Sequence, residues 1–516
     1  MTRATWLALG AMAISVFVIA NDVTALSVAL PEIEKDFDAD VSTVQWVINA
    51  YALVFGVLIV TGGRLADMLG RRRMFFIGAA IFAGFSLLGG AAQDALWLIG
   101  CRALMGIGGA LMWPAVLGMT FDILPEDKAG LAGGLILGAA GFGNAAGPLL
   151  GGALTDALSW RWVMFVNIPI AAAACFVTWR SVRESSSGGA EAGIDVPGVA
   201  TLSVGLVSLL IALDQVTEWG WGDPRILALF AGCALLLTAF VVIERRAGER
   251  ALVPREVMAN PSFRAACVTT LLMSAVFFVV LVYLPQFMQK ILGWDPIEAG
   301  AGLLPLMGVF AATSFAAGPL YARVGAKIMV TAGAVCLTAG TFLISLVGPD
   351  SGWGELVPGM VVTGVGVGLF YSSITTAAVT AVDPSRSSLA GGIVYMFQVA
   401  GGSIGLGLTT TVFTTASEDR LQSAAAGLSD SEVKDVQGVL AGTESAAQVL
   451  ARQGAATADR LVELVREAFV SGLVWSFRLV AVLALGGLVV AVLFVGGSLL
   501  GRRREEPAPT VADPAA

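Results

Sequence analysis

The stretch that decides the fold is Gly63-Arg64-Leu65-Ala66-Asp67-Met68-Leu69-Gly70-Arg71-Arg72-Arg73, which lies between two long apolar runs. Three consecutive arginines are too costly to place in hydrocarbon, so this loop is expected in water at one face of a membrane. Asp67 precedes Arg71 by four residues, a spacing at which the two can pair across one helical turn. Gly70 between them allows the chain to turn sharply.

The composition is typical of a protein that crosses the membrane many times. Of the residues, 57% are hydrophobic and only 13% are charged, against roughly 25% charged in soluble domains. The 63 glycines suit helices that pack through small residues. The chain has no His, so a proton carried within the membrane would need a carboxylate or, failing that, Tyr, Lys or Arg.

Several function classes find no support in the sequence. The five cysteines stand apart within apolar runs, which favours small core residues over a disulfide or a metal site. The phosphate-binding pattern Gly-x-x-x-x-Gly-Lys-[Ser/Thr] is absent, so we expect an ion gradient rather than ATP as the energy source. We expect no cofactor, no metal and no nucleic-acid partner, because the net charge of −8 does not point to one.

A spanning helix needs about 20 largely apolar residues, and on this criterion we expect fourteen spans. The first is too long for the apolar core of a signal peptide. The candidate spans are 6–29, 43–62, 74–92, 95–118, 131–154, 162–180, 197–214, 225–243, 264–288, 298–318, 327–347, 355–376, 391–413 and 473–499.

The basic residues predict the orientation, because cytoplasmic loops carry an excess of Lys and Arg. With both termini in the cytoplasm, the short outer loops hold only Lys35, Arg161, Arg225 and Lys290. The segment 414–472 is polar and acidic, and loops of that length cross regardless of their charge. We expect it to be an extracellular loop, either a passive surface insertion or a lid over the outer vestibule.

A weak internal repeat divides the chain into two halves. A shift of about 255 residues places the glycine, leucine and basic positions of the 63–73 loop on Gly318, Leu320, Gly325 and Lys327. We therefore expect an N-terminal six-helix bundle (1–185), two extra transmembrane helices (195–245), a C-terminal six-helix bundle (260–413 and 473–500) and a cytoplasmic tail (501–516).

The 63–73 loop closely resembles the signature loop of the major facilitator superfamily, G-x-L-x-D-x-x-G-R-R/K-R/K, which joins helices 2 and 3. The alternative is a generic loop that obeys the positive-inside rule. Asp122, with Glu126 and Asp127, ends the fourth span on the same face. We expect Asp122 or a neighbour to pair with Arg71 or Arg72. Together with Asp67, this pair would hold an inner gate closed in one state of the protein. The alternative is that these charges are solvated independently.

Asp22 is the deepest acid of the first span, roughly 24 Å from the helix start. An ionisable group at that depth is a functional-site hypothesis by default; a capped or paired Asp near the outer interface is the alternative. Asp22 lies in the stretch 21–31, which reads Asn-Asp-Val-Thr-Ala-Leu-Ser-Val-Ala-Leu-Pro. This stretch resembles the motif L-D-x-T-x-x-x-V-A-L-P of the fourteen-helix drug:proton antiporter family. Asn21 stands where that motif has Leu, a departure that could make the site wetter.

Two further basic and acidic residues are candidates for proton coupling. Arg102 lies well within the fourth span and begins a stretch that resembles the superfamily motif R-x-x-x-G-x-G, in which the Arg is linked to proton transfer. An Arg snorkelling to the outer headgroups is the alternative. Glu298, near the start of its span, is a weaker candidate in a stretch that also looks like a family motif.

The fifth span carries a pattern of small residues around a proline. The pattern G-x-x-x-G-P-x-x-G-G closely resembles the antiporter motif of superfamily exporters. Physically, a G-xxx-G face and a helix-interior Pro give a close, bendable contact between helices. Its positions here are Gly143, Gly147, Pro148, Gly151 and Gly152.

Together these features predict an all-α integral membrane protein with the major facilitator fold and fourteen transmembrane helices. The family resemblance implies a proton-coupled antiporter that exports amphipathic, often cationic drugs or antibiotics across the cytoplasmic membrane by alternating access. Its partners would be small-molecule substrates, protons and the lipid bilayer, and we expect a monomer. The alternatives are export of one dedicated metabolite, lipid or peptide, and a transporter-like scaffold that does not turn over.

The orientation makes a testable prediction. In a Cys-free variant of the chain, Leu440→Cys should react with a membrane-impermeant thiol reagent added to intact cells, and Arg250→Cys should not, because 414–472 is outside and the loop holding Arg250 is inside. Labelling at position 250 but not at position 440 would overturn the orientation.

Overall fold

The computed structural model describes residues 2–185, 193–424 and 455–496, which form helices with short connections and no strand. Fourteen segments of this part of the chain are long and apolar enough to cross a membrane. The fold class and the number of spans predicted from the sequence are therefore confirmed.

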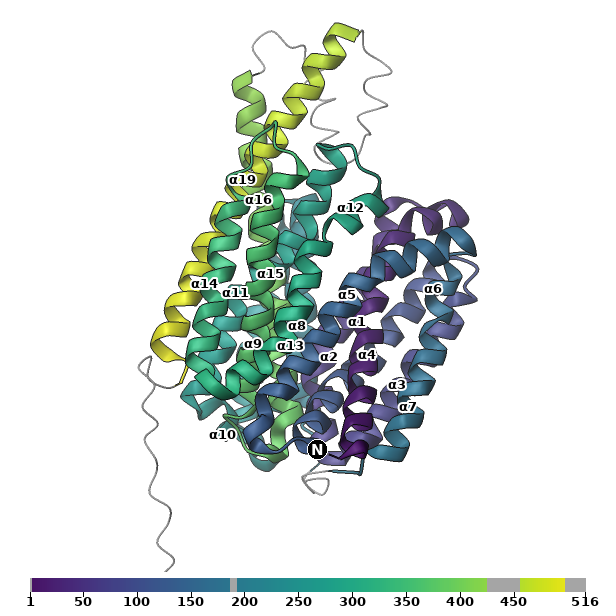
Figure 1. Cartoon of the computed structure of the whole chain (residues 1–516), viewed down its shortest axis with the longest axis vertical. Coiled ribbons are helices and arrows are strands. Elements are labelled where there is room, and N and C mark those ends of the chain that lie inside the picture. Colours follow the sequence, from purple (N-terminus) through teal and green to yellow (C-terminus); the bar gives the residue numbers. More distant parts are fainter. Residues whose placement is uncertain (1, 186–192, 425–454, 497–516) are drawn as a thin grey trace, which may run out of the picture.

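The first half of the chain forms seven helices that give six spans (Figure 1, purple to blue). Because the chain breaks its helix at Val166, one candidate span, Arg161–Ser181, consists of two helices. The seven are α1 (Arg3–Phe37), α2 (Val41–Leu69), α3 (Arg71–Gly90), α4 (Ala95–Ile123), α5 (Ala129–Ala157), α6 (Arg161–Phe165) and α7 (Asn167–Ser181).

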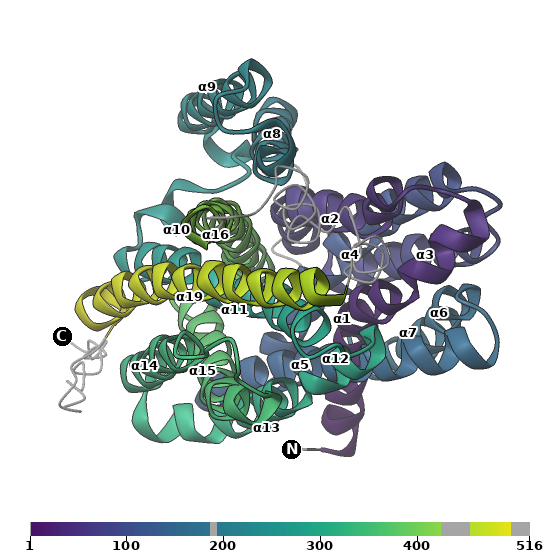
Figure 2. The same cartoon turned by 90° about the horizontal axis from the view of Figure 1, so that it is seen from above.

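The second half begins with a helix pair, α8 (Val196–Trp219) and α9 (Pro224–Ala247), that stands beside the two bundles (Figure 2). Short helices α10 (Arg255–Ala259) and α12 (Pro296–Gly302) connect longer ones. The remaining helices are α11 (Pro261–Lys290), α13 (Leu304–Val324), α14 (Ala326–Ile344), α15 (Trp353–Val379), α16 (Ser387–Ala424) and α19 (Ala455–Phe494).

The loop expected at 63–73 is only one residue long in the structure. α2 ends at Leu69 and α3 begins at Arg71, and Gly70 between them has φ 109°, a backbone conformation that favours glycine. Glu184 accepts hydrogen bonds from the backbone N–H groups of Arg72 and Arg73, both at 3.0 Å, and so satisfies the free end of α3.

The two halves meet along two helix pairs. α5 packs against α13 on one side of the interface and α2 packs against α16 on the other, while α8 contacts both α2 and α16 (Figure 2). Small residues let the backbones approach, since a Cβ added to Gly134 would lie 2.7 Å from the Ser314 carbonyl oxygen. The extra helix pair therefore rests on a seam between the bundles.

The helices that flank the polar segment 414–472 are longer than the sequence analysis expected. α16 continues to Ala424 and α19 begins at Ala455, and the two ends pair beyond the bundle (Figure 1, top). Arg420 and Glu467 form an ion pair of 2.9 Å, and Leu421 and Leu461 are buried. Apolar residues at helical spacing thus extend both helices into a segment whose polarity suggested a loop. Residues 425–454 lie outside the described part of the chain.

α1 and α5 approach closely through the predicted glycine face. A Cβ at Gly151 would lie 2.1 Å from the carbonyl oxygen of Ala25, and one at Gly147 would lie 1.9 Å from the hydroxyl oxygen of Thr24. At Gly152, by contrast, the nearest atom belongs to Ile297 at 3.6 Å, which is an ordinary contact. The glycines at 147 and 151 therefore set the distance between the two helices.

This contrast gives a paired prediction. Gly151→Ala should lower the melting temperature of the purified protein, because overpacking costs about 1–3 kcal/mol, more than the roughly 1 kcal/mol that Ala gains over Gly inside a helix. Gly152→Ala is the matched control, one residue away in the same helix, and should leave the melting temperature unchanged or raised. Equal melting temperatures for the two variants would contradict the close α1–α5 contact.

Candidate functional site

Among the described residues, the most deeply buried charges form one ion pair. Asp22 of α1 and Arg102 of α4 are both 0% exposed, and Arg102 Nη1 lies 2.5 Å from Asp22 Oδ2. The two sequence candidates, chosen separately, therefore meet in the structure. Arg102 does not extend toward headgroups.

Three further helices hold this pair in place. Asn167, the first residue of α7, donates a hydrogen bond of 2.7 Å to the second carboxylate oxygen of Asp22. Arg102 Nε donates to the carbonyl oxygen of Val47 in α2 at 3.0 Å, and its guanidinium lies 4.5 Å from the ring centroid of Tyr51. Ser86 of α3 accepts a hydrogen bond of 3.2 Å from Asn167.

Several polar atoms around the pair have no partner among the described residues. They are Arg102 Nη2, Asn167 Oδ1, the Tyr51 hydroxyl and both amide atoms of Asn21. A buried polar atom without a partner costs about 1–3 kcal/mol, so the site carries spare donors and acceptors that a bound water or proton carrier could satisfy.

Sequence reasoning missed Asn167, Ser86 and Tyr51 as members of this site. Asn167 was visible only as part of a Trp-Arg-Trp stretch followed by Asn-x-Pro. Nothing in its own neighbourhood signals contact with Asp22, which lies 145 residues earlier.

A second charged cluster joins the ends of α2, α3 and α4. Arg71 is 3% exposed and Asp67 is 1% exposed, and Arg71 Nε donates to Asp67 Oδ1 at 3.0 Å. Arg71 also forms an ion pair with Asp122 at the end of α4. The structure thus brings together three of the four residues that we expected at the inner gate.

This cluster reaches across to the other half of the chain. Asp67 accepts hydrogen bonds from the backbone N–H groups of Ser388 and Leu389 at 3.3 and 2.8 Å, at the first turn of α16. Arg71 Nη2 donates to the carbonyl oxygen of Pro384 at 2.8 Å. A carboxylate at a helix N-terminus is favoured by the unpaired N–H groups and by the helix dipole, so Asp67 ties α2 to the start of α16.

The turn that precedes α16 is itself held by a side chain. Asp383 accepts a hydrogen bond from the backbone N–H of Ser385 at 2.8 Å. Hydrogen bonds from the side chain and the backbone of Ser385 lower the pKa of Asp383, so this carboxylate remains ionised well below neutral pH.

Two predicted site residues lie elsewhere. Arg72 does not join the charged cluster: its guanidinium donates to the carbonyl oxygen of Trp179 in α7 at 3.0 Å. Glu298 is exposed and forms a capping box with Asp295 at the start of α12. Both positions have a local role at a helix end, and neither contacts the Asp22–Arg102 pair.

Aromatic rings from both halves meet at the interface. The Tyr395 ring of α16 lies 4.8 Å from Trp113 of α4 and 5.3 Å from Phe55 of α2, centroid to centroid. Phe55 in turn stacks on Tyr51, the residue whose ring faces Arg102. The ring of Tyr51 therefore connects the buried ion pair to the aromatic contacts between the two bundles.

The helical spans and the buried charge pair define a polytopic membrane protein with an intramembrane charged site, a feature that marks substrate or proton pathways. The chain belongs to the Major Facilitator Superfamily, whose sequence model matches residues 12–406. It is accordingly a multi-pass membrane transporter and not an enzyme.

Similar proteins agree with this assignment. The chain is 33% identical over 416 residues to the puromycin resistance protein pur8 of Streptomyces alboniger, covering 80% of this chain and 82% of that one. It is 30% identical over 515 residues to the tetracenomycin C resistance and export protein of Streptomyces glaucescens, covering 99% and 95%. The fold resembles the crystal structure of the human organic anion transporter MFSD10 with a TM-score of 0.61, at 11% identity, covering 95% of this chain and 100% of that one.

The charged cluster at Asp67 yields a prediction for transport. Asp67→Asn should slow transport in proteoliposomes while the protein still folds, because Asn keeps the size but loses the charge that orders Arg71 and holds the start of α16. Glu256→Gln is the control: it removes an exposed ion pair with Arg386, in which the Glu256 side chain is 82% exposed, and such pairs contribute about 0–1 kcal/mol. A normal transport rate for Asp67→Asn would show that the loop is only a topology signal.

Proposed function

We propose that this protein is a proton-coupled antiporter that exports amphipathic, often cationic drugs or antibiotics across the cytoplasmic membrane by alternating access. The observation that carries the proposal is the Asp22–Arg102 pair, which is fully buried within two membrane-spanning helices. Intramembrane carboxylates are expensive and are typical of proton relays in transporters.

The proton step uses Asp22. In the deprotonated state its carboxylate compensates Arg102 and accepts from Asn167. When a proton binds, the ion pair is lost and Arg102 is left to its remaining partners, which are the Val47 carbonyl, the Tyr51 ring and the Met105 sulfur. Because an uncompensated buried charge costs about 3–5 kcal/mol, proton binding would favour a different arrangement of α1 and α4.

The alternating step uses the cluster at Asp67. Its hydrogen bonds to Ser388 and Leu389 tie the two halves at the end that carries the N-terminus (Figure 1), which the basic residues assign to the cytoplasm. Opening toward the cytoplasm must break these contacts. Toward the opposite end α5 contacts α12, where Gly300 approaches Pro148, and this contact would part when the outer side opens.

The ring cluster supports an amphipathic substrate. Tyr395 belongs to the second half and Trp113 and Phe55 belong to the first, so the contacts of Tyr395 must separate whenever the halves part there. Exposed aromatic faces would then be available to stack on a flat apolar substrate or, through cation–π attraction, to hold a cationic one.

Export of one dedicated metabolite is the second candidate. It is favoured by relatives that are named after a single compound, namely the puromycin resistance protein and the tetracenomycin C resistance and export protein. Both candidates share the transport mechanism and differ in substrate range. A panel of cationic dyes and antibiotics in proteoliposomes with an imposed pH gradient separates them, because a dedicated exporter moves one member and a multidrug exporter moves several.

Asp22→Asn is the direct test of the proton step. Asn keeps the size and the hydrogen bonding of Asp but cannot titrate, so efflux driven by a pH gradient should be abolished while substrate still binds. In the unmodified protein a cationic substrate should bind more weakly as the pH falls, because protons compete for Asp22. This pH dependence should disappear in the variant.

The control for this experiment is Asp36→Asn on the same helix. Asp36 is a half-exposed acid that pairs with Arg161, so its loss should leave gradient-driven efflux and the pH dependence of binding unchanged. Wild-type efflux by Asp22→Asn would contradict the assignment of Asp22 as the proton carrier, and Glu298 would be the next candidate. No turnover of any substrate by the unmodified protein would favour a non-transporting scaffold.

A further inference from the structure

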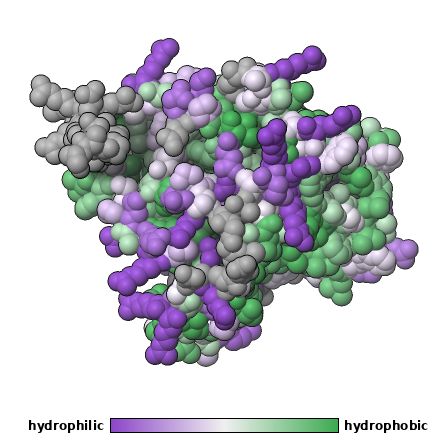
Figure 3. Space-filling model, turned by 90° about the horizontal axis from the view of Figure 1, so that it is seen from below, coloured by the Kyte–Doolittle hydropathy of each residue, from purple (hydrophilic) through white to green (hydrophobic). Residues whose placement is uncertain are grey.

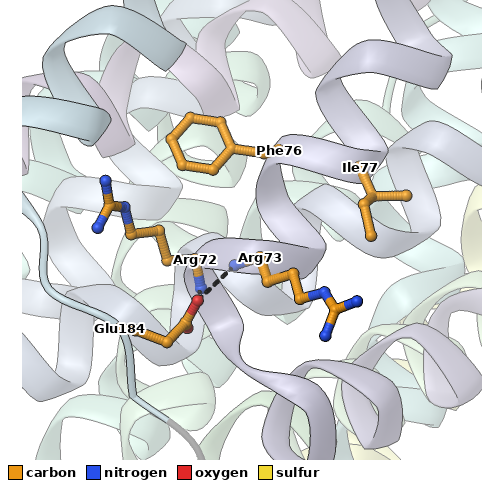
Figure 4. Close-up of a pocket in the computed structure, with 5 residues that line it drawn as sticks. All are labelled: Arg72, Arg73, Phe76, Ile77 and Glu184. Carbon is orange, nitrogen blue, oxygen red and sulfur yellow. Dashed lines mark hydrogen bonds between the residues drawn. The ribbon is translucent and has the colours of Figure 1, made fainter.

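A small pocket lies on the outer surface of α3, at the end where this helix begins (Figure 4). Its volume is about 380 Å³. We refer to it as the α3 pocket, and its lining consists of Arg72, Arg73, Phe76, Ile77 and Glu184. It is separate from the Asp22–Arg102 pair and from the cluster at Asp67, and the transport mechanism above does not use it.

The pocket lies where a membrane changes from headgroups to hydrocarbon. The candidate span that contains it starts at Arg71, so the two arginines stand at the headgroup level and Phe76 and Ile77 stand one turn further into the membrane. Figure 4 shows the two arginine side chains splayed to either side, with the ring of Phe76 and the side chain of Ile77 above them.

The charges of the pocket favour an anion. The lining holds two guanidiniums and one carboxylate, and that carboxylate, Glu184, already accepts hydrogen bonds from the backbone N–H groups of Arg72 and Arg73. Arg73 is exposed, and neither a hydrogen bond nor an ion pair of its guanidinium occurs within the described residues. The Nε atom of Arg72 is buried and also lacks a partner within those residues.

The neighbouring helix end extends the same pattern. Phe176 and Trp179 of α7 are both 59% exposed, and the guanidinium of Arg180 lies 5.7 Å from each of their ring centroids. Arg72 connects this end to the pocket through its hydrogen bond to the Trp179 carbonyl oxygen. Exposed Trp together with basic side chains is typical of the membrane interface, and Figure 3 shows hydrophilic side chains gathered on this end of the molecule.

We propose that the α3 pocket binds the headgroup of an anionic phospholipid. The phosphodiester would pair with the guanidiniums of Arg72 and Arg73, for which Arg is well suited because its planar fork matches phosphate oxygens. The apolar side chains of Phe76 and Ile77 would contact the first carbons of an acyl chain. A free phosphate shares the charge but not this second contact, and the adjoining hydrocarbon level assigns the pocket to a lipid.

The binding would attach lipid to the α3 and α7 helix ends beside Arg71. Because Arg71 belongs to the cluster that ties the two halves together, the lipid would occupy a position next to the inner gate without contacting its buried carboxylates. Lipid would bind at the surface of the transporter whether or not protons are coupled to transport, and whatever the substrate is.

The test is lipid binding by the purified full-length transporter in detergent, measured by native mass spectrometry. Phosphatidylglycerol should bind more tightly than phosphatidylcholine with the same acyl chains. Arg73→Gln and Arg72→Gln should each weaken phosphatidylglycerol binding about fivefold, the equivalent of about 1 kcal/mol per basic residue near an anionic surface, and should leave phosphatidylcholine binding unchanged. The backbone hydrogen bonds to Glu184 do not involve these side chains, so the start of α3 should remain intact.

Arg323→Gln is the matched control, because it removes an exposed arginine from the last turn of α13 in the other half. It should not alter phosphatidylglycerol binding. An equal loss in Arg323→Gln and Arg73→Gln would reduce the effect to general surface charge and overturn the proposal, as would equal binding of the two lipids.

Two further measurements distinguish a lipid site from a soluble-phosphate site and keep the test valid if an arginine variant misfolds. Glycerol phosphate should fail to displace phosphatidylglycerol, and displacement at equal concentration would show a free-anion site instead. Phe76→Ser keeps every charge and should weaken phosphatidylglycerol binding through the lost acyl contact. If an arginine variant does not elute as a folded monodisperse species, the Phe76 variant decides the outcome, and undiminished binding in it would contradict the lipid site.

Discussion

Hydrocarbon offers no hydrogen-bond partners, and this constraint shapes the whole molecule. Every regular element in the described ranges is a helix, which satisfies its backbone internally. The same constraint acts on the side chains: Arg102 is completely buried, so it must meet a carboxylate, and Asp22 supplies it. Removing either partner would leave an uncompensated charge at a cost of about 3–5 kcal/mol. The pair therefore fixes α1 against α4, while the glycines of α5 allow α1 to lie close on its other side.

α4 connects the two charged sites of the N-terminal half. Arg102 near its beginning holds the buried pair, and Asp122 at its end contacts Arg71. Twenty residues of helix separate them, a distance of roughly 30 Å at 1.5 Å per residue. Because Arg71 bonds the Pro384 carbonyl of the other half, α4, which carries Pro114 between its two charges, reaches from the buried pair to the contact between the halves. A change in the tilt of α4 would thus act on both ends, which gives the proposed coupling a physical route.

Sequence patterns located most of the charged positions and some of their partners. Asp67, Arg71 and Asp122 meet as expected, because Asp67 and Arg71 lie four residues apart across the turn at Gly70 and Asp122 ends a span on the same face. Arg72 instead lies against α7, since successive residues of a helix point about 100° apart. Glu298 caps its own short helix, as the Asp at its N-cap and the spacing of three residues allow. Asn167 completes the buried site although no local pattern marked it.

The sequence by itself determined what depends on neighbouring residues: the number of spans, the sharp turn at Gly70, and the small-residue face of α5. These follow from hydropathy, backbone freedom and helical spacing, which act within a few turns of chain. Tertiary structure alone decided which distant groups meet, such as Asp22 with Arg102, and where Tyr395 contacts Trp113 across the halves. It also decided that α16 and α19 continue as a pair beyond the bundle. Those contacts depend on how whole helices pack, and packing depends on surfaces that residues far apart in the chain create together.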